Sequence, residues 1–287
     1  MTINTLQNKN FGTLSIVATP IGNLDDITPR AIETLKSVDI IACEDTRTSG
    51  KLLNHFNIDT TTWAYHEHNA DVQTAKFIEL LQNGKNIALI SDAGTPLVSD
   101  PGYQLVLACH DTNIKTLPVV GASAAIAALS VAGLPSDKFS FLGFLPAKQS
   151  GRLKQLEAYA NHCETMIFYE APHRITACLT DMAVIFGLDR EITYCRELTK
   201  TFETVYKTTL DDLIDFVSHD PNQQKGEIVL VVAGKPNHEH KDIAQHDTLL
   251  LRLLDDLSVK KAAALASDIT GVKKNALYQR LLALQKS

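Results

Sequence analysis

The stretch that decides the fold reads Asn86-Ile87-Ala88-Leu89-Ile90-Ser91-Asp92-Ala93-Gly94-Thr95-Pro96-Leu97-Val98-Ser99-Asp100-Pro101-Gly102. Its first five residues predict a buried strand, and the glycines, prolines and aspartates that follow are typical of a tightly turned loop. In open α/β proteins such loops lie at the carboxyl edge of a sheet, where ligands bind. The functional site is therefore expected at this loop.

Strand and helix signals alternate around the loop, which favours an α/β architecture with a mainly parallel first sheet. Before the loop, strands are predicted at residues 14–19 and 39–43, and helices at 28–37 and 69–83. After the loop, a helix at 103–110 and a strand at 114–119 complete a first domain, predicted to span residues 1–120.

A second α/β domain is predicted for residues 121–236. The small-residue run Gly121 to Ala128 opens a helix that ends at Gly133 and leads into this domain. Two successive strands without a helix between them, on either side of Glu197 to Glu203, indicate a mixed sheet. The predicted strands are 139–142, 166–169, 191–195, 204–207 and 228–233, and the predicted helices are 152–162, 175–186 and 211–219.

The last predicted domain, residues 237–287, is small and helical. The polar segment 236–246 is interpreted as a linker, and short helices follow at 249–254, 260–268 and 274–284. Gly271 lies between the last two, as in a helix-turn-helix. From Val259 onward the chain has six basic residues against Asp268 alone, a net charge of +5 on a chain whose total is −6. The tail is thus electrostatically separate from an acidic body.

Length and composition indicate a globular protein. With 287 residues and 45% hydrophobic residues, the chain can bury more than one ordinary core. No apolar run reaches the 18 or so residues of a membrane span, and the polar first ten residues do not look like a signal peptide, so a cytoplasmic location without membrane contact is expected. The five cysteines are scattered, and we interpret them as core residues rather than disulfides or zinc ligands.

Three loops of small residues each follow a predicted strand. They are Thr19 to Asn23, Asp92 to Pro96 and Gly121 to Ala124. Small side chains let a ligand lie against backbone N–H and C=O groups, although each loop alone is equally consistent with tight-turn packing. The G-x-G-x-x-G and G-x-x-x-x-G-K-[ST] patterns are absent, which argues against a dinucleotide fold and a P-loop.

Taken together, the motifs resemble the tetrapyrrole methylase superfamily, from about Gly12 to Gly234. The segments that carry the resemblance are Val17 to Leu24, Glu44 to Arg47, Tyr65 to Asn69, Ser91 to Gly102, Phe168 to Arg174 and Cys195 to Lys200. The resemblance implies two α/β domains that bind S-adenosylmethionine between them without a metal. It is strongest to the branch that methylates a cytidine ribose 2′-oxygen in 16S rRNA of the small ribosomal subunit, and it implies a homodimer.

The resemblance also implies which residues bind the cofactor. Gly94-Thr95-Pro96 stands where most members have Gly-Asp-Pro, so the contact there would pass to Thr95 and backbone, with Val98 against the ligand and Asp92 nearby. Pro20 matches the first cofactor loop and Ser123-Ala124 the second. The opposite wall is expected to be lined by Glu170-Ala171 and Ala233-Gly234.

Carboxylates near these loops are candidates for proton transfer. Asp100, Glu44 and Asp45 could accept a proton from a ribose hydroxyl, and Arg47 could bind a phosphate through two hydrogen bonds. The alternative for the Glu44 to Arg47 group is a surface ion pair and helix cap, with Asp45 or Thr46 capping a helix that runs to His55.

Other polar residues are candidates for RNA contact. His66 and Asn69 could contact RNA, although a solvated loop is an alternative, and His66, Glu67 and His68 lack a convincing further metal ligand. Arg174 and Arg196 could face the same cleft, or could belong to a helix start and a surface ion network. In the tail, the expected phosphate contacts are Lys260, Lys261, Lys273, Lys274 and Arg280.

Two further functions stay open at this point. One is methylation of a tetrapyrrole such as a precorrin, which the shared architecture permits but the basic tail does not favour. The other is a ribosome-assembly factor that binds S-adenosylmethionine without catalysis.

Overall fold

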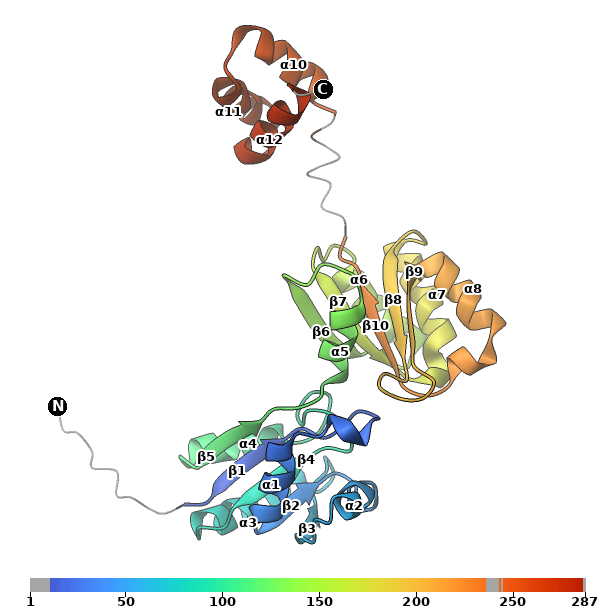
Figure 1. Ribbon diagram of the computed structural model, residues 1–287. Helices are drawn as coiled ribbons and strands as arrows, with labels where there is room; N and C mark the ends of the chain where they lie inside the picture. The colour runs from blue at the N-terminus through green and yellow to red at the C-terminus, as the bar shows by residue number, and fades with distance from the viewer. Residues whose placement is uncertain (1–10, 236–242, 244, 286–287) are drawn as a thin grey trace, which may run out of the picture. The chain divides into compact units, whose positions relative to one another are not determined.

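The structure of this protein is a computed structural model that describes residues 11–235, 243 and 245–285. The chain divides into two units, Met1–Ala233 and Gly234–Ser287. The first unit contains two five-stranded sheets with helices packed on them, and the second contains helices (Figure 1). None of the helices that the structure describes is long and apolar enough to cross a membrane.

The first sheet is wholly parallel, as the alternating sequence signals predict. Its strand order is β3-β2-β4-β1-β5. The strands are β1 (Thr13–Val17), β2 (Ile40–Cys43), β3 (Thr62–Ala64), β4 (Ile87–Ile90) and β5 (Lys115–Val119). The edge strand β3 is absent from the prediction, because it is three half-buried residues long.

Helices cover both faces of this sheet because side chains alternate along each strand. Leu89 of β4 packs with α3 (Ala70–Gln82) and α4 (Tyr103–Asp111), whereas its neighbour Ile90 packs with α1 (Pro29–Ser37) and α2 (Thr46–His55). Local sequence sets where these helices start: Thr28 caps α1 by accepting a hydrogen bond from the Ala31 backbone N–H at 3.2 Å, and Pro29 opens the first turn.

The order of the strands creates a crevice at the carboxyl edge of the sheet. The connection from β1 leads to β2 on one side, while the connection from the adjacent strand β4 leads to β5 on the other. Loops that leave neighbouring strands in opposite directions are where open α/β sheets bind ligands. Here the two loops are joined by an antiparallel bridge between Thr19 and Gly94, with N–H to O distances of 2.8 and 3.1 Å.

The second sheet is mixed, as predicted, with the order β6-β7-β10-β8-β9. One face packs on α5 (Ala124–Val131), and the other packs on α6 (Gln149–Tyr159), α7 (Ile175–Phe186) and α8 (Leu210–His219). The strands are β6 (Phe139–Phe144), β7 (Thr165–Glu170), β8 (Glu191–Arg196), β9 (Thr204–Thr209) and β10 (Ile228–Val232).

The second unit is built from α10 (Asp247–Asp256), α11 (Val259–Thr270) and α12 (Lys274–Leu284). Leu250, Leu277 and Leu281 are fully buried in its core. Gly271 ends α11 in the left-handed conformation at φ 73°, so the predicted turn between the last two helices is present. Most of the predicted linker, 236–242 and 244, lies outside the described residues, and the predicted domain boundaries stay predictions.

The prediction that all five cysteines are core residues is wrong for one of them. Cys43, Cys109, Cys178 and Cys195 are buried, whereas Cys163 is exposed. Cys163 lies in the connection between α6 and β7, where neither a sheet nor a helix face covers it.

Candidate functional site

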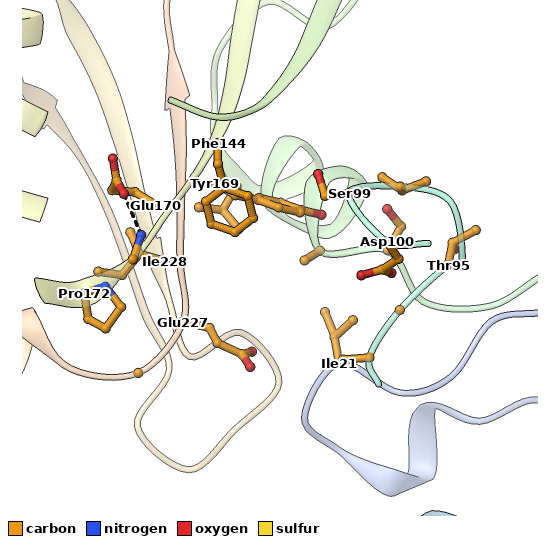
Figure 2. Close-up of a pocket in the computed structure, with 18 residues that line it drawn as sticks. Ile21, Thr95, Ser99, Asp100, Phe144, Tyr169, Glu170, Pro172, Glu227 and Ile228 are labelled. Carbon is orange, nitrogen blue, oxygen red and sulfur yellow. Dashed lines mark hydrogen bonds between the residues drawn. The ribbon is translucent and has the colours of Figure 1, made fainter. Parts of the chain in front are cut away.

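A cavity of about 340 Å³ lies in the first unit, where loops of the first sheet meet strand ends of the second. This volume is within the range of about 300–1,000 Å³ that is usual for small-molecule sites. Figure 2 shows Thr95 and Asp100 on one side of it and Phe144 and Tyr169 on the other. The lining residues are Ile21, Ala93, Gly94, Thr95, Val98, Ser99, Asp100, Ser123, Ala124, Phe144, Tyr169, Glu170, Ala171, Pro172, Gly226, Glu227, Ile228 and Val229.

The loop after β4 has an unusual backbone. Leu97 and Ser99 adopt left-handed conformations at φ 72° and 68°, each of which costs roughly 1–3 kcal/mol for a non-glycine residue. Gly102 has a φ of 136°, and a Cβ there would lie 2.8 Å from the Leu89 side chain. The loop therefore folds tightly over the end of β4 and turns Thr95 and Asp100 into the cavity.

A side-chain hydrogen bond joins this loop to the one after β5. The Thr95 hydroxyl donates to the Ala122 backbone oxygen at 2.9 Å. The next residues, Ser123 and Ala124, open α5 and line the cavity with small side chains, so a ligand can reach their backbone groups.

The opposite wall is apolar and aromatic. The Tyr169 ring meets the Phe141 and Phe144 rings edge to face, with centroids 4.9 and 5.6 Å apart. The Tyr169 hydroxyl accepts a hydrogen bond from the Ala125 backbone N–H at 3.2 Å, which fixes the ring against the start of α5. Such a wall suits a flat heterocycle.

Asp100 is a carboxylate that lines the cavity. Burial raises the pKa of Asp100 to about 6, the Ser91 hydroxyl opposes this shift by a hydrogen bond, and the Asp92 charge adds to it. The pKa of nearby Glu44 is also raised, first by desolvation and then by the charges of Asp92, Asp100 and other carboxylates. Because these groups repel one another, a positively charged ligand would stabilise their ionised forms.

Comparison with known proteins agrees with this arrangement. Residues 13–214 match the family described as Tetrapyrrole (Corrin/Porphyrin) Methylases.

The chain belongs to the tetrapyrrole methylases.

Within this methylase family, near-full-length relatives are named ribosomal RNA small subunit methyltransferase I. The Pseudomonas aeruginosa protein of that name is 53% identical over 96% of this chain and 98% of its own length. The Haemophilus influenzae protein is 50% identical over 93% and 95%. Residues 240–285 of the methylase match the RsmI C-terminal HTH domain. The protein is therefore a methyltransferase.

Solved structures confirm the fold. The structure of diphthine synthase superposes with a TM-score of 0.59 at 15% identity and covers 77% of this chain and 90% of its own. At this identity the likeness extends to the fold alone.

Most residues predicted for the cofactor lie around the cavity of the methylase. They are Gly94, Thr95, Val98, Ser123, Ala124, Glu170 and Ala171. Pro20 and Asp92 instead line an adjoining groove. The roles of both sets of residues as ligand contacts stay predictions.

The expectation that Ala233 and Gly234 line the opposite wall is wrong. Strand β10 runs antiparallel to β7, so Ile228 pairs with Glu170 at the cavity while Val232 pairs with Met166 at the far end. The residues of β10 that reach the cavity are those at its start.

Glu170 lines the cavity, but its carboxylate already accepts hydrogen bonds from other groups of the protein. The Ala171 backbone N–H donates to Glu170 Oε1 at 2.7 Å (Figure 2). The Arg174 Nε donates to the same oxygen at 2.7 Å, and the carboxylate is buried. Arg174 also donates to the Leu145 backbone oxygen. The Arg174 guanidinium therefore fixes the end of β7, and its contact with RNA stays a prediction.

The Glu44 to Arg47 group acts as a helix cap. The Asp45 carboxylate accepts from the Arg47 backbone N–H at 2.7 Å and pairs with its guanidinium at 3.0 Å. The pair with Arg47 lowers the pKa of Asp45 to about 2, and neither Glu44 nor Asp45 lines the cavity. Asp45 therefore caps α2 and forms an ion pair, which is the alternative interpretation of the sequence. Arg47 is exposed at the start of α2.

Two other predicted RNA contacts have structural partners. Asn69 accepts from the His66 backbone N–H at 2.9 Å and donates to the Ala64 oxygen at 3.1 Å, which holds the turn after β3. Arg196 is buried and donates to Gln223 and to the Phe202 oxygen, and its contact with RNA stays a prediction. Among the described residues, no group of three or more His, Cys, Asp or Glu could hold a metal ion.

The tail places its lysines at the starts of two successive helices. Lys260 and Lys261 are exposed at the start of α11, and Lys273 and Lys274 at the start of α12. Arg280 differs, because it binds Asp247 of α10 through two nitrogen atoms and so joins two helices of the unit.

Sequence reasoning misses several cavity residues. Phe144 is 53% exposed at the end of β6, beside a bulge at Gly143, and Gly226 and Glu227 precede β10. The parallel pairing of β6 with β7 places the end of β6 beside Tyr169. Phe144 is recognised as a cavity residue only when this pairing is known.

Proposed function

We propose that this methylase transfers a methyl group from S-adenosylmethionine to the ribose 2′-oxygen of a cytidine in 16S rRNA of the small ribosomal subunit. The observation that carries the proposal is the likeness, at 45–53% identity over nearly the full chain, to relatives named for that RNA. The cavity supports the donor part of the proposal, and the lysines of the tail support the RNA part.

The cavity fits the donor chemically. Backbone groups at Gly94, Ser123 and Ala124 are accessible for the polar edges of a nucleoside, and Tyr169 offers a ring for the base. Asp100 supplies a negative charge for the sulfonium. When bound, the donor supplies a methyl group that is already activated for displacement.

Positioning is expected to dominate catalysis. Holding donor and acceptor in line can contribute roughly 7–11 kcal/mol, whereas a general base contributes roughly 3–5 kcal/mol. The cavity is built for such alignment, because its two walls are tied together by the Thr95–Ala122 and Ala125–Tyr169 hydrogen bonds. Asp100 is the proposed carboxylate beside the reacting methyl, and the charge of Asp92 acts on it.

The tail is proposed to bind rRNA phosphates. Lys260, Lys261, Lys273 and Lys274 are exposed, and phosphate contacts of this kind give affinity that falls with salt. The first unit then selects one nucleotide while the tail supplies affinity that does not depend on sequence.

Homodimer formation is also proposed. Apolar side chains are exposed after the edge strand β5 and along α5, where Val120 is 68% and Ile126 52% exposed. Exposed apolar residues grouped in this way are typical of protein interfaces. Sedimentation at micromolar concentration should report a dimer, and a monomer would refute this part.

The test of the proposed function is methyl transfer. The protein is incubated with methyl-labelled S-adenosylmethionine and small ribosomal subunits that lack their own methylation. Label in the ribose of one cytidine supports the proposal. Donor binding without transfer would instead support a non-catalytic assembly factor, and transfer to a precorrin but not to subunits would support tetrapyrrole methylation.

A further inference from the structure

A second hollow adjoins the cavity on the other side of Ile21 and Ala93. This groove has a volume of about 250 Å³ and shares Ile21, Ala93 and Glu227 with the cavity. Because the two hollows share these side chains, a group bound in the groove lies directly next to a group bound in the cavity. That is the relationship a methyl acceptor needs to its donor.

One wall of the groove is a face of α2. Thr48 and Lys51 are three residues apart on this helix, so they project side by side, and both line the groove. Lys51 is exposed, and no acidic residue in the described part of the chain forms an ion pair with it. Lys51 therefore presents its positive charge to the groove.

The facing wall is Lys200, whose charge is compensated. Its ammonium lies 2.8 Å from Glu197 and 3.0 Å from Glu227. Gly22 permits this closure, because a Cβ there would lie 2.5 Å from Lys200 Cγ. The Asn23 backbone N–H also donates to the Thr199 hydroxyl at 3.1 Å. Lys51 is thus the cation of the groove that is available to a phosphate.

Asp92 lines the groove next to Ala93, one of the residues that the groove shares with the cavity. It accepts a hydrogen bond from the Asp45 backbone N–H at 3.3 Å, which orients its carboxylate. A carboxylate is an acceptor for a sugar hydroxyl and not for a phosphate. The groove therefore offers the Lys51 ammonium for a phosphate and the Asp92 carboxylate for a hydroxyl.

We propose that this groove binds the acceptor nucleotide, with Lys51 contacting its phosphate and Asp92 accepting the proton of the ribose 2′-hydroxyl. The inference rests on the proposed function and deepens it. In the step, the 2′-oxygen forms a bond to the methyl carbon as the carbon–sulfur bond breaks. The electron pair of that bond stays on sulfur, which becomes a neutral thioether, and the hydroxyl proton passes to Asp92 and then to water.

Lys51 is tested by charge reversal against a matched lysine. Lys76 is exposed on α3, on the opposite face of the same sheet, so Lys76→Glu makes the same charge change away from the groove. Lys51→Glu should raise the KM for small subunits by about tenfold or more, and Lys51→Ala should reduce the salt slope of subunit binding by about 1. Donor affinity by calorimetry should stay within about twofold, which also reports correct folding.

Asp92→Asn tests the carboxylate of the groove. The transfer rate at saturating donor and subunits should fall by about 100-fold, the lower range for a general base, with donor affinity changed by less than about threefold. If wild-type enzyme transfers no methyl to subunits, the proposed function fails. If wild type transfers and Lys51→Glu matches Lys76→Glu, or if Asp92→Asn transfers at the wild-type rate, the groove is not the acceptor site.

Discussion

The Thr95 hydroxyl donates a hydrogen bond to the Ala122 backbone oxygen at 2.9 Å. This bond joins the loop after β4 to the loop after β5, and both loops line the cavity. The threonine stands where the resemblance leads one to expect an acid, and in this chain its hydroxyl joins two of the loops that line the cavity.

Replacing Thr95 with valine tests this link. Thr95→Val keeps the shape but leaves the Ala122 oxygen without its donor, which costs about 0.5–1.5 kcal/mol of net interaction. Donor affinity should therefore fall by roughly three- to tenfold in calorimetry. The control is Thr112→Val, which removes a comparable hydroxyl bond to Ala108 at the end of α4, away from the cavity. Equal donor affinity in both variants would contradict the link.

Filling the cavity should abolish donor binding. Ala124 lines the cavity at the start of α5, and Ala124→Phe would place a ring where the ligand is proposed to lie. Donor binding should become undetectable by calorimetry while the melting temperature changes little, because the ring enters open space. Val184→Phe, on an exposed position of α7, serves as control. Normal affinity in Ala124→Phe would move the donor site elsewhere.

The raised pKa of Asp100 predicts a pH dependence of donor binding. A sulfonium favours ionised Asp100, and burial holds the pKa of this carboxyl at about 6 in the free protein. Below that pH the carboxyl is protonated, so the Kd for S-adenosylmethionine should rise by about tenfold between about pH 7 and pH 5. The uncharged thioether S-adenosylhomocysteine should show a much smaller change. If the two ligands have identical pH profiles, or if Asp100→Asn leaves the profile unchanged, the charge of Asp100 does not act on the sulfonium.

The lysines at the start of α12 should contribute to RNA affinity and not to donor affinity. Replacing Lys273 and Lys274 with alanine should weaken subunit binding and reduce its salt slope by up to about 2, because two fewer phosphates are neutralised. Donor affinity should stay intact, because the cavity lies in the other unit. The double variant Lys36→Ala and Lys76→Ala removes the same charge from the first unit as a control. An unchanged salt slope would exclude these lysines from the interface.

Much of the fold can be predicted from the sequence because the buried strands and their helices carry strong patterns. The glycines, prolines and aspartates of the loop after β4 predict a ligand-binding edge, and the cavity lies there. Strand β3 escapes prediction because an edge strand of three half-buried residues has no alternating pattern to detect.

The errors at the site have a common physical origin. Strand direction decides which end of β10 meets the cavity, and a lone apolar run does not reveal its direction, so the sequence suggests Ala233 in place of Ile228. Arg174 and Arg196 are expected to face the cleft, and their hydrogen bonds with Glu170 and with the Phe202 oxygen are tertiary contacts that the sequence does not show. Tertiary partners such as Glu170 cannot be identified from local sequence.

The most direct measurement is a crystal structure of the protein with S-adenosylhomocysteine bound. Density for the ligand is expected between the loop that carries Thr95 and Asp100 and the wall at Tyr169, with its sulfur toward Ile21 and Ala93 and the groove at Lys51 left open. Density for the ligand in the groove, or outside the cavity altogether, would contradict this expectation.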